Sequence, residues 1–478
     1  MSSSSFSPPK DDFSKELKSI RKMVNWRNAK ERSSFLDRVL FLIKNWNGQL
    51  PDLRDIFRPE EMDWLLTEDF KNRYGPVISR RNCNFIKFVV KAGYKESSDV
   101  DKNIKPLLRR TTALHWATRL NYYYDGVIKL FEIYDRFDVN YTDESGLSHF
   151  HAACKFGCRD VVVEFLAAGQ DPNYIWKETG DSPLHLALAN ANKEVVELLV
   201  RNGADPNLVN EDGSTPLHII SKRETYRDSG LANLFLKYID EEYQQTLLVD
   251  VQDKLCRTSL QWAVANMQPH VLDILLDRGA DLSRFIFPNE SYFGKKYDPE
   301  NYRDDITITL ASSTLIIVEN LEKNGYKLDR SDALMIMTYF AHFEGLFEKS
   351  ASLDKCWYDN EEFTVAAKEI VVSSSLSLYD LVRLLPEETE KHLTYADYLS
   401  FTKAKPDYYW DLPDDFTEAC SAHLSEIIMR GFCRRWALES FLELMRHQLS
   451  IERCEMFIKQ LMNKDLYRIC LAAAGYSA

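Results

Sequence analysis

Apolar residues recur along the middle of the chain in short stripes that fit one side of a helix. Positions three and four apart lie on the same face of an α-helix, so each stripe predicts a helix with one buried face. The clearest stripes are Val161, Val162, Phe165 and Leu166; Val195, Val196, Leu198 and Leu199; and Val271, Leu272, Leu275 and Leu276. A glycine follows each stripe, and glycine readily adopts the left-handed conformation in which many helices end.

A second signature precedes each helix and keeps the same spacing. It reads Thr112-Ala113-Leu114-His115, Ser148-His149-Phe150-His151, Ser182-Pro183-Leu184-His185, Thr215-Pro216-Leu217-His218 and Thr258-Ser259-Leu260-Gln261. Successive copies begin 36, 34, 33 and 43 residues apart, and the longest interval contains an insertion at 224–246. We expect this insertion to be a longer second helix plus a loop. Each unit therefore predicts a turn, a short helix, a longer helix and a loop that contains glycine.

This pattern resembles the ankyrin repeat, whose T-P-L-H-x-A motif recurs at about 33 residues. The resemblance covers about residues 104 to 284 and implies an all-α solenoid, in which neighbouring repeats cover one another's apolar faces. The outer copies depart from the motif: Ala113 replaces proline, Gln261 replaces histidine, and Cys256 replaces a hairpin glycine. The resemblance also implies a protein that binds other proteins and is not an enzyme.

The flanks are predicted to be helical but lack the repeat signature. We divide the chain into a disordered tail, an N-terminal helical cap, the ankyrin repeats, degenerate ankyrin-like or capping helices, and a C-terminal helical domain. The boundaries are 1–10, 11–78, 79–284, 285–350 and 351–478, respectively. Within the fourth segment, apolar spacing predicts helices at about 308–323 and 331–348.

The C-terminal sequence from Leu449 to Leu466 resembles the PRANC domain, an F-box-like module of poxvirus ankyrin proteins. The whole layout is similar to the expanded ankyrin families of parasitoid wasps. In the viral relatives such a tail docks on the Skp-type adaptor of a cullin–RING ubiquitin ligase, while the repeats recruit a target. Ser450 stands where F-box modules usually have proline. The residues carried over as docking positions are Leu449, Ile451, Met456, Ile458, Leu461 and Leu466. The alternative is that these apolar residues form the core of their own domain.

Composition narrows the class of partner and the compartment. The net charge of −13 disfavours direct binding of nucleic acid, which usually requires a basic surface. The serine-rich start predicts no secretory signal, and the apolar runs are too short to cross a membrane. Nine cysteines without a C-x-x-C pair fit reduced thiols. We therefore expect a cytoplasmic protein, with the nucleus left open.

Catalytic and metal chemistry has little support in the sequence. His149, His151, Cys154 and Cys158 combine residue types that bind zinc, but His151 occupies the repeat's own histidine position, where a structural hydrogen bond accounts for it. The phosphate-binding, H-E-x-x-H and G-x-S-x-G motifs are missing from the sequence. We predict neither an enzyme nor a cofactor.

Matching the repeats position by position predicts a concave protein-binding groove. Hairpin tips and the ends of the first helices would contribute Thr111, Arg119, Leu120, Glu144, Leu147, Lys155, Phe156, Glu178, Asp181, Asn190, Asp212, Ser214, Lys222, Arg223, Lys254, Arg257 and Asn266. Phe156 would be an aromatic anchor, whereas the charged members have the simpler interpretation of a solvated face. The predicted function is a protein-binding scaffold that serves as a ligase adaptor; the alternative is a purely structural or sequestering scaffold.

Overall fold

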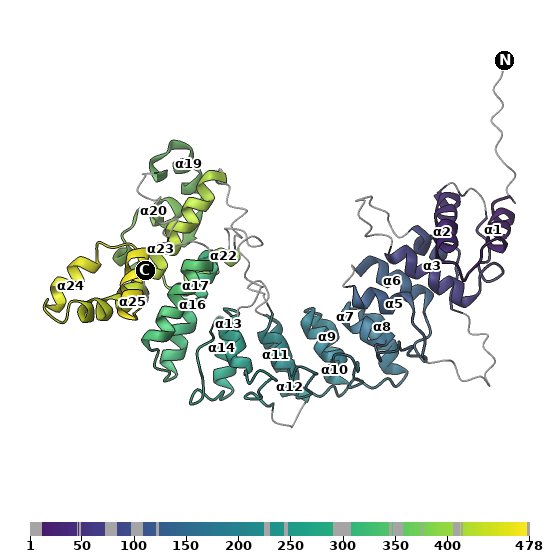
Figure 1. Cartoon of the computed structure of the whole chain (residues 1–478), viewed down its shortest axis with the longest axis horizontal. Helices are drawn as coiled ribbons and strands as arrows, with labels where there is room; N and C mark the ends of the chain where they lie inside the picture. The colour runs from purple at the N-terminus through teal and green to yellow at the C-terminus, as the bar shows by residue number, and fades with distance from the viewer. Residues whose placement is uncertain are drawn as a thin grey trace, which may run out of the picture. The chain divides into compact units, whose positions relative to one another are not determined.

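The computed structural model describes most of the chain and is helical almost throughout (Figure 1). The described residues are 12–44, 46, 49–71, 84–96, 109–120, 124–223, 230–242, 247–289, 307–343, 347, 357–373, 376–404, 412 and 414–475. The predicted disordered tail lies outside them. The chain forms two compact units, the first comprising Met1–Ile219 with Leu234–Leu247 and the second comprising Ile220–Asn233 with Leu248–Ala478.

The first unit begins with helices that cover the start of the repeats. They are α1 (Asp12–Lys22), α2 (Ala29–Lys44), α3 (Pro59–Lys71) and α4 (Asn84–Lys91). The Trp26 ring packs edge-on against Phe35 and Trp64, with ring centroids 5.5 and 6.2 Å apart. Helix α3 packs against the first helix of the first repeat, as a terminal cap on a stack of repeats should.

Each repeat is a pair of helices. The pairs are α5 (Ala113–Arg119) with α6 (Tyr124–Ile133), α7 (His149–Lys155) with α8 (Arg159–Ala167), α9 (Pro183–Ala189) with α10 (Lys193–Arg201), and α11 (Pro216–Ser221) with α12 (Gly230–Glu242). The Ser148 and Ser182 hydroxyls accept hydrogen bonds from backbone N–H groups at the starts of α7 and α9. Gly203 ends α10 with a φ of 88°, which confirms the left-handed position expected there.

Helix α12 confirms that the insertion contains a longer second helix. It has 13 residues, whereas α8 and α10 have nine each. The boundary between the two compact units passes through this fourth repeat, before Ile220 and after Asn233.

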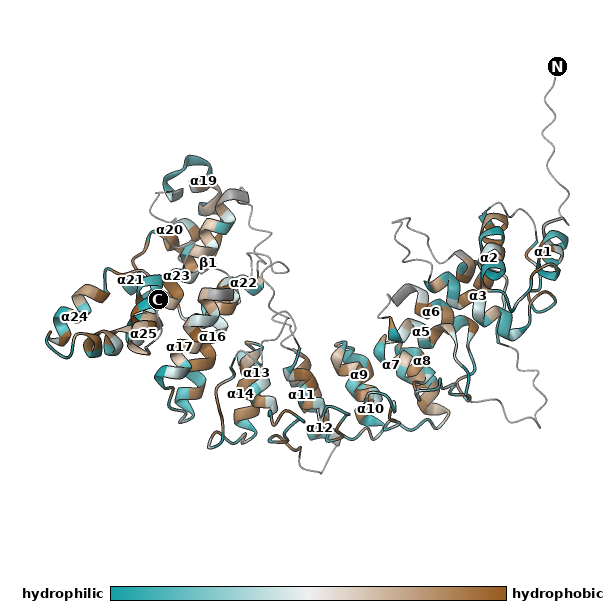
Figure 2. Cartoon of the chain, viewed as in Figure 1, coloured by the Kyte–Doolittle hydropathy of each residue, from teal (hydrophilic) through white to brown (hydrophobic). Residues whose placement is uncertain are grey.

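The second unit continues with α13 (Ser259–Ala265) and α14 (Pro269–Asp277), the fifth repeat. Helix α14 packs against α16 (Thr307–Lys323), and α17 (Arg330–Phe343) follows. These two helices confirm the helical prediction for about 308–323 and most of that for 331–348. Figure 2 shows hydrophobic stretches in this region, and most of the side chains of α16 are buried.

The C-terminal part of this unit is organised around one long helix, α23 (Asp414–Leu444). The other elements of this part are the 3₁₀ turn η6 (Trp357–Asp359), α19 (Glu361–Glu369), β1 (Val371–Ser373), β2 (Leu376–Ser377), α20 (Leu378–Arg383), α21 (Pro386–His392), α22 (Tyr395–Ala404), α24 (Ile451–Ile458) and α25 (Asn463–Ala473). Helix α23 contacts α16, α17, α20, α21, α24 and α25. The small antiparallel pair β1–β2 is the one departure from an entirely helical expectation within the described residues.

Candidate protein-binding surfaces

The predicted groove positions divide into exposed, half-buried and buried residues. In the first unit, the exposed ones are Thr111, Arg119, Leu120, Glu144, Glu178, Asn190 and Asp212, and the half-buried ones are Lys155, Phe156 and Asp181. In the second unit, Lys254 is exposed and Lys222, Arg223 and Arg257 are half-buried. Each unit thus retains part of the predicted surface on its hairpins and first-helix ends. Phe156 is less accessible than an exposed anchor would be.

Three predicted contact residues are buried, so their assignment to the surface was wrong. Leu147 and Ser214 lie under their hairpins, where their carbonyl oxygens accept hydrogen bonds from Asp143 and Asn210. Asn266 is turned inward, and its amide donates to the carbonyl oxygen of Ser221. All three take part in backbone hydrogen bonds within or between repeats. Aligning the repeats by position does not distinguish such a structural role from a role in contacting a partner.

Arg119 links three successive repeats of the first unit. Its Nη2 lies 2.8 Å from the Asp143 carboxylate and its Nη1 lies 2.9 Å from that of Glu178. Its guanidinium also lies 5.7 Å from the centre of the Trp176 ring. Burial alone would raise the pKa of Asp143, but hydrogen bonds from Ser145 and Arg119 hold that pKa below its ordinary value. Two predicted groove residues, Arg119 and Glu178, therefore connect neighbouring hairpins.

The second unit contains a similar arrangement around Asp253. The Lys222 Nζ lies 3.1 Å from the Asp253 carboxylate, and the Trp262 indole N–H donates to the same carboxylate at 2.9 Å. The Lys222 ammonium and the Arg257 guanidinium lie 4.6 and 4.9 Å from the centre of the Trp262 ring. Lys222, like Arg119 in the first unit, thus joins neighbouring repeats and also contributes positive charge to the surface.

The histidines of the motif form hydrogen bonds between repeats. The two ring nitrogens of His151 each lie 2.8 Å from an oxygen, Nδ1 from the Ser148 hydroxyl and Nε2 from the Tyr174 carbonyl. His149 Nε2 lies 2.7 Å from the Thr112 hydroxyl. Burial lowers the pKa of His151 to about 4 and that of His149 well below its ordinary value. Both rings are therefore neutral and occupied by the repeat's own hydrogen bonds.

The cysteines of the candidate zinc constellation are buried as well. Burial raises the pKa of Cys158 to about 12 and that of Cys154 well above its ordinary value, which disfavours the thiolate that zinc binds. Across the described ranges, no three His, Cys, Asp or Glu side chains form a group that could hold a metal ion. The described helices likewise include none long and apolar enough to cross a membrane.

The C-terminal docking residues do not share one environment. Ile451 and Met456 on α24 are 56% and 68% exposed, whereas Leu449 and Leu461 are half-buried. Ile458 and Leu466 are buried, which contradicts their assignment to a docking surface. These two belong to the core of the domain, the alternative considered for all six.

Sequence reasoning missed one exposed apolar residue of α24. The Phe457 side chain is 60% exposed and lies beside Phe441 of α23, with ring centroids 6.4 Å apart. Cys454 and Ile458, four positions apart, define the buried face of the helix. Recognising that pair as the inner face would have placed Phe457 outside it. Figure 2 shows the resulting mixture of hydrophobic and hydrophilic residues along α24.

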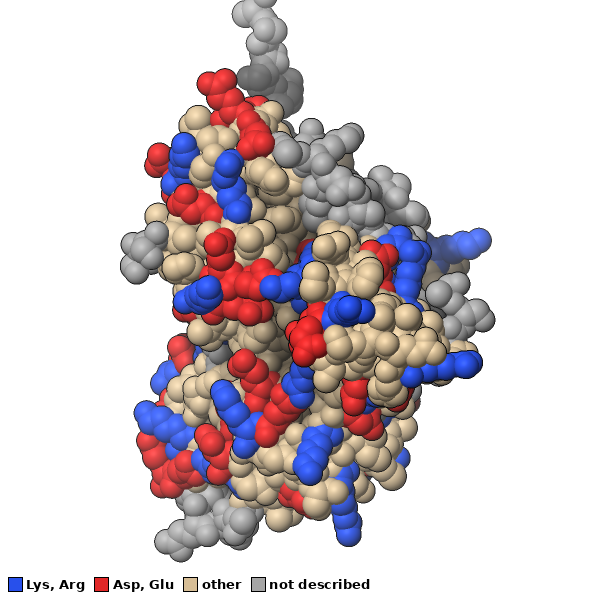
Figure 3. Space-filling model, turned by 90° about the vertical axis from the view of Figure 1, so that its left-hand side faces the viewer, with Lys and Arg blue, Asp and Glu red and all other residues tan. Residues whose placement is uncertain are grey.

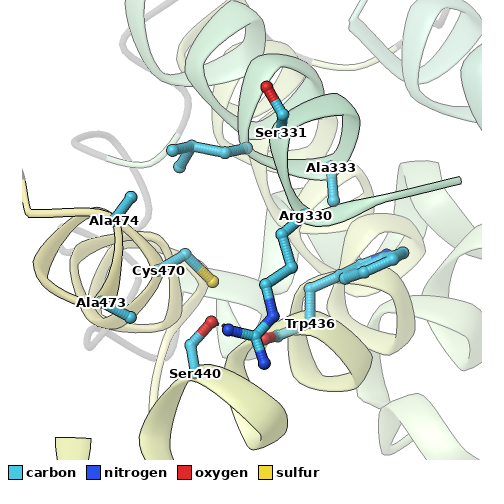
Figure 4. Close-up of a pocket in the computed structure, with 9 residues that line it drawn as sticks. Arg330, Ser331, Ala333, Trp436, Ser440, Cys470, Ala473 and Ala474 are labelled. Atoms are coloured by element: carbon cyan, nitrogen blue, oxygen red, sulfur yellow. Dashed lines mark hydrogen bonds between the residues drawn. The ribbon is translucent and has the colours of Figure 1, made fainter. Parts of the chain in front are cut away.

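A cavity of about 360 Å³ lies where α17, α23 and α25 meet. Arg330, Ser440 and Cys470 converge there (Figure 4). Arg330 forms ion pairs with Glu439 and Glu443, and burial raises the pKa of the Cys470 thiol. Its arginine is thus already paired and its thiol is not activated, so the cavity has the character of a packing gap between helices.

The geometry defines the class of protein: pairs of short antiparallel helices joined by hairpins, each covering the apolar face of the next. A family model described as ankyrin repeats (3 copies) matches residues 114–210 and 184–285. The chain therefore contains ankyrin repeats from residue 114 to residue 285, arranged as an all-α solenoid with helical flanks. Such repeats typically serve as scaffolds for interactions between proteins.

Several known proteins are similar to part of this chain. Human BCL-6 corepressor-like protein 1 is 36% identical over 110 residues, which are 23% of this chain and 6% of that protein. The putative ankyrin repeat protein FPV014 of fowlpox virus is 31% identical over 131 residues, 27% of this chain and 28% of the viral protein. Human neurogenic locus notch homolog protein 1 is 29% identical over 143 residues, 30% of this chain and 5% of that protein. The chain thus spans less than a third of each of these relatives.

Proposed function

We propose that this protein is a substrate adaptor: its ankyrin repeats bind a target protein and α24 docks on the Skp-type adaptor of a cullin–RING ubiquitin ligase. The repeats support the first half of the proposal, because ankyrin repeats bind protein targets. The resemblance of the C-terminal sequence to the PRANC domain supports the second. The similarity to a fowlpox virus ankyrin repeat protein is consistent with the first half.

The observation that carries the docking half is the exposure of apolar side chains on α24. Ile451, Met456 and Phe457 are each more than half exposed on a helix of eight residues. Exposing large apolar side chains is unfavourable in water, and helix-in-groove complexes use such side chains as anchors. Figure 3 shows basic and acidic side chains interspersed with uncharged surface on the side of the molecule that lies to the left in Figure 1. We therefore expect apolar contacts, more than net charge, to provide the affinity.

The target half of the proposal rests on the exposed hairpin and first-helix positions of the first unit. Leu120 is 43% exposed at the end of α5, and Asn190 is exposed at the end of α9. Glu144 and Asp212 are exposed on the hairpins. These side chains provide one apolar and several polar contacts to a target, while the Arg119 links keep the hairpins in place.

The docking half is tested with full-length protein and a purified Skp-type adaptor. We expect the unaltered chain to bind with measurable affinity by calorimetry, and the double variant Met456→Glu, Phe457→Glu to lose at least tenfold, because it places charges where apolar contacts are needed. Val365→Glu on α19 is the matched control, since Val365 is 65% exposed. Its substitution should leave the affinity unchanged.

A second candidate function is a sequestering scaffold that grips a target and recruits no ligase. The buried Ile458 and Leu466 favour it, because part of the F-box-like sequence serves the domain's own core. Failure of the full-length chain to bind the adaptor at any tested concentration would contradict the ligase link and leave this function.

A further inference from the structure

Helix α24 is too short to be stable by itself. It has eight residues, whereas isolated helices shorter than about 12–15 residues are marginal in water. Its inner face offers the buried side chains of Cys454 and Ile458, and the Ser450 side chain makes no capping hydrogen bond to it. Something beyond its own sequence must therefore hold it in helical form.

Two arginines of α23 contact the segment in which α24 ends. Arg434 Nη2 donates to the carbonyl oxygen of Lys459 at 2.7 Å, and Arg430 Nη1 donates to that of Leu461 at 3.0 Å. The last carbonyl groups of a helix lack partners within the helix and carry partial negative charge. Arg434 supplies such a partner to Lys459, the C-cap residue of α24, and Arg430 holds the turn that follows at Leu461, so the two contacts stabilise the end of the helix and the turn after it.

Both arginines are themselves fixed by carboxylates. Arg434 Nη1 donates to Glu387 of α21 at 2.8 Å, and Arg430 Nη2 donates to Glu426 of α23 at 3.0 Å. The Glu426 carboxylate also accepts the backbone N–H of Asn463, the first residue of α25, at 2.8 Å. The loop between α24 and α25 is thus held from both sides.

We propose that Arg430 and Arg434 are positioning residues that hold α24 as a preformed docking helix. This inference rests on the proposed function for its biological meaning, because the docking surface is that of Ile451, Met456 and Phe457. The partner then needs an apolar groove that accepts a rigid helix. Because α24 is already folded, binding does not carry the entropic cost of ordering a disordered segment.

The test measures hydrogen exchange in the full-length chain. The reporters are the backbone amides of Lys459, Gln460 and Leu461, which donate to the carbonyl oxygens of Glu455, Phe457 and Ile458. We expect Arg434→Gln to raise their exchange rates about tenfold, because the end of the helix loses its partner. The matched control is Arg435→Gln, which removes an exposed arginine of the same helix that pairs instead with Glu322.

Hydrogen exchange of the α25 amides distinguishes a general loss of structure from a local loss of α24 positioning. Arg434→Gln should leave the amides of Leu466 to Cys470 protected, whereas Arg430→Gln also strips the buried Glu426 of its charge partner and should loosen that helix. Unchanged exchange at residues 459–461 in Arg434→Gln, or an equal increase in Arg435→Gln, would overturn the proposal.

Calorimetry with the purified Skp-type adaptor distinguishes this inference from the proposed function. We expect Arg434→Gln to bind about tenfold more weakly than the unaltered chain, although every apolar contact residue remains. If the unaltered chain does not bind the adaptor but Arg434→Gln still raises the exchange rates at residues 459–461, the positioning role is supported and the ligase link is contradicted. Full affinity with increased exchange would show that rigidity is not needed for docking.

Discussion

Buried neutral histidines make the stability of the repeats depend on pH. Burial lowers the pKa of His115 and His151 to about 4, against 6.5 for an exposed histidine. Between these values the unfolded chain binds protons that the folded chain does not, so stability falls as the pH is lowered from about 6.5 towards 4. Each such histidine contributes on the order of 2–3 kcal/mol to this loss.

The fifth repeat supplies a substitution that tests the effect. Gln261 stands at the histidine position, accepts the Thr258 backbone N–H at 2.9 Å and donates to the Ile286 carbonyl oxygen at 3.2 Å. We expect His151→Gln to keep the equivalent bonds and to reduce the pH slope of the unfolding free energy by about 1.4 kcal/mol per pH unit. Urea unfolding between pH 4.5 and 6.5 measures it. The reciprocal change Gln261→His should steepen the slope, and an unaltered slope in both variants would refute the assignment.

At the scale of elements, an ion cluster joins the N-terminal cap to the repeats. Arg110 donates to Asp63 of α3 at 2.6 Å and also pairs with Glu96, which follows α4. The Tyr134 hydroxyl donates to the same Asp63 carboxylate at 2.7 Å. Burial raises the pKa of Glu96, although Arg110 opposes that shift. The cap is therefore attached by charge as well as by apolar packing.

Removing the central cation should detach the cap. We expect Arg110→Met to cost about 3–5 kcal/mol, because two partly buried carboxylates lose their partner. Urea unfolding monitored by tryptophan fluorescence measures the loss. The neighbouring exposed Arg109 donates to the Glu144 carbonyl, and Arg109→Met is the matched control with an expected cost below about 1 kcal/mol. Equal losses would mean that the cluster contributes no more than a surface contact.

The elements also show what sequence reasoning could and could not reach. Helix starts at Ser148, Ser182 and Thr258 were predictable because capping is a local property of the chain. The burial of Leu147 depends on packing within the hairpin, and that of Asn266 depends on a bond to the preceding repeat. The burial of these two side chains therefore cannot be predicted from the residue type and its place in the repeat alone. The choice of Phe457 over Ile458 as the exposed residue likewise depends on which side of α24 meets α23.

At the scale of the molecule, two compact units predict separate responses to mutation. Leu184 in α9 belongs to the first unit and Leu424 in α23 to the second, and both are fully buried. Each substitution by alanine should cost about 2–5 kcal/mol. Because stability in repeat stacks depends mainly on nearest neighbours, Leu184→Ala should speed hydrogen exchange in α7 to α10 and leave α23 protected. Leu424→Ala should do the reverse, and increases spread evenly over both units would instead indicate one cooperative structure.

The long helix α23 has a further consequence for how the protein is made. Contacts between repeats in the first unit join residues a few tens of positions apart, whereas Arg435 of α23 pairs with Glu322 across 113 residues and Tyr467 bonds Thr338 across 129. Domains fold as units during synthesis, and distant contacts must wait until both partners have emerged. The first repeats can therefore assemble on the ribosome, while the face of α16 that meets α23 and the faces of α17 that meet α23 and α25 stay uncovered until those two helices have been translated. During that interval these faces of α16 and α17 are exposed apolar surface of the kind that chaperones bind.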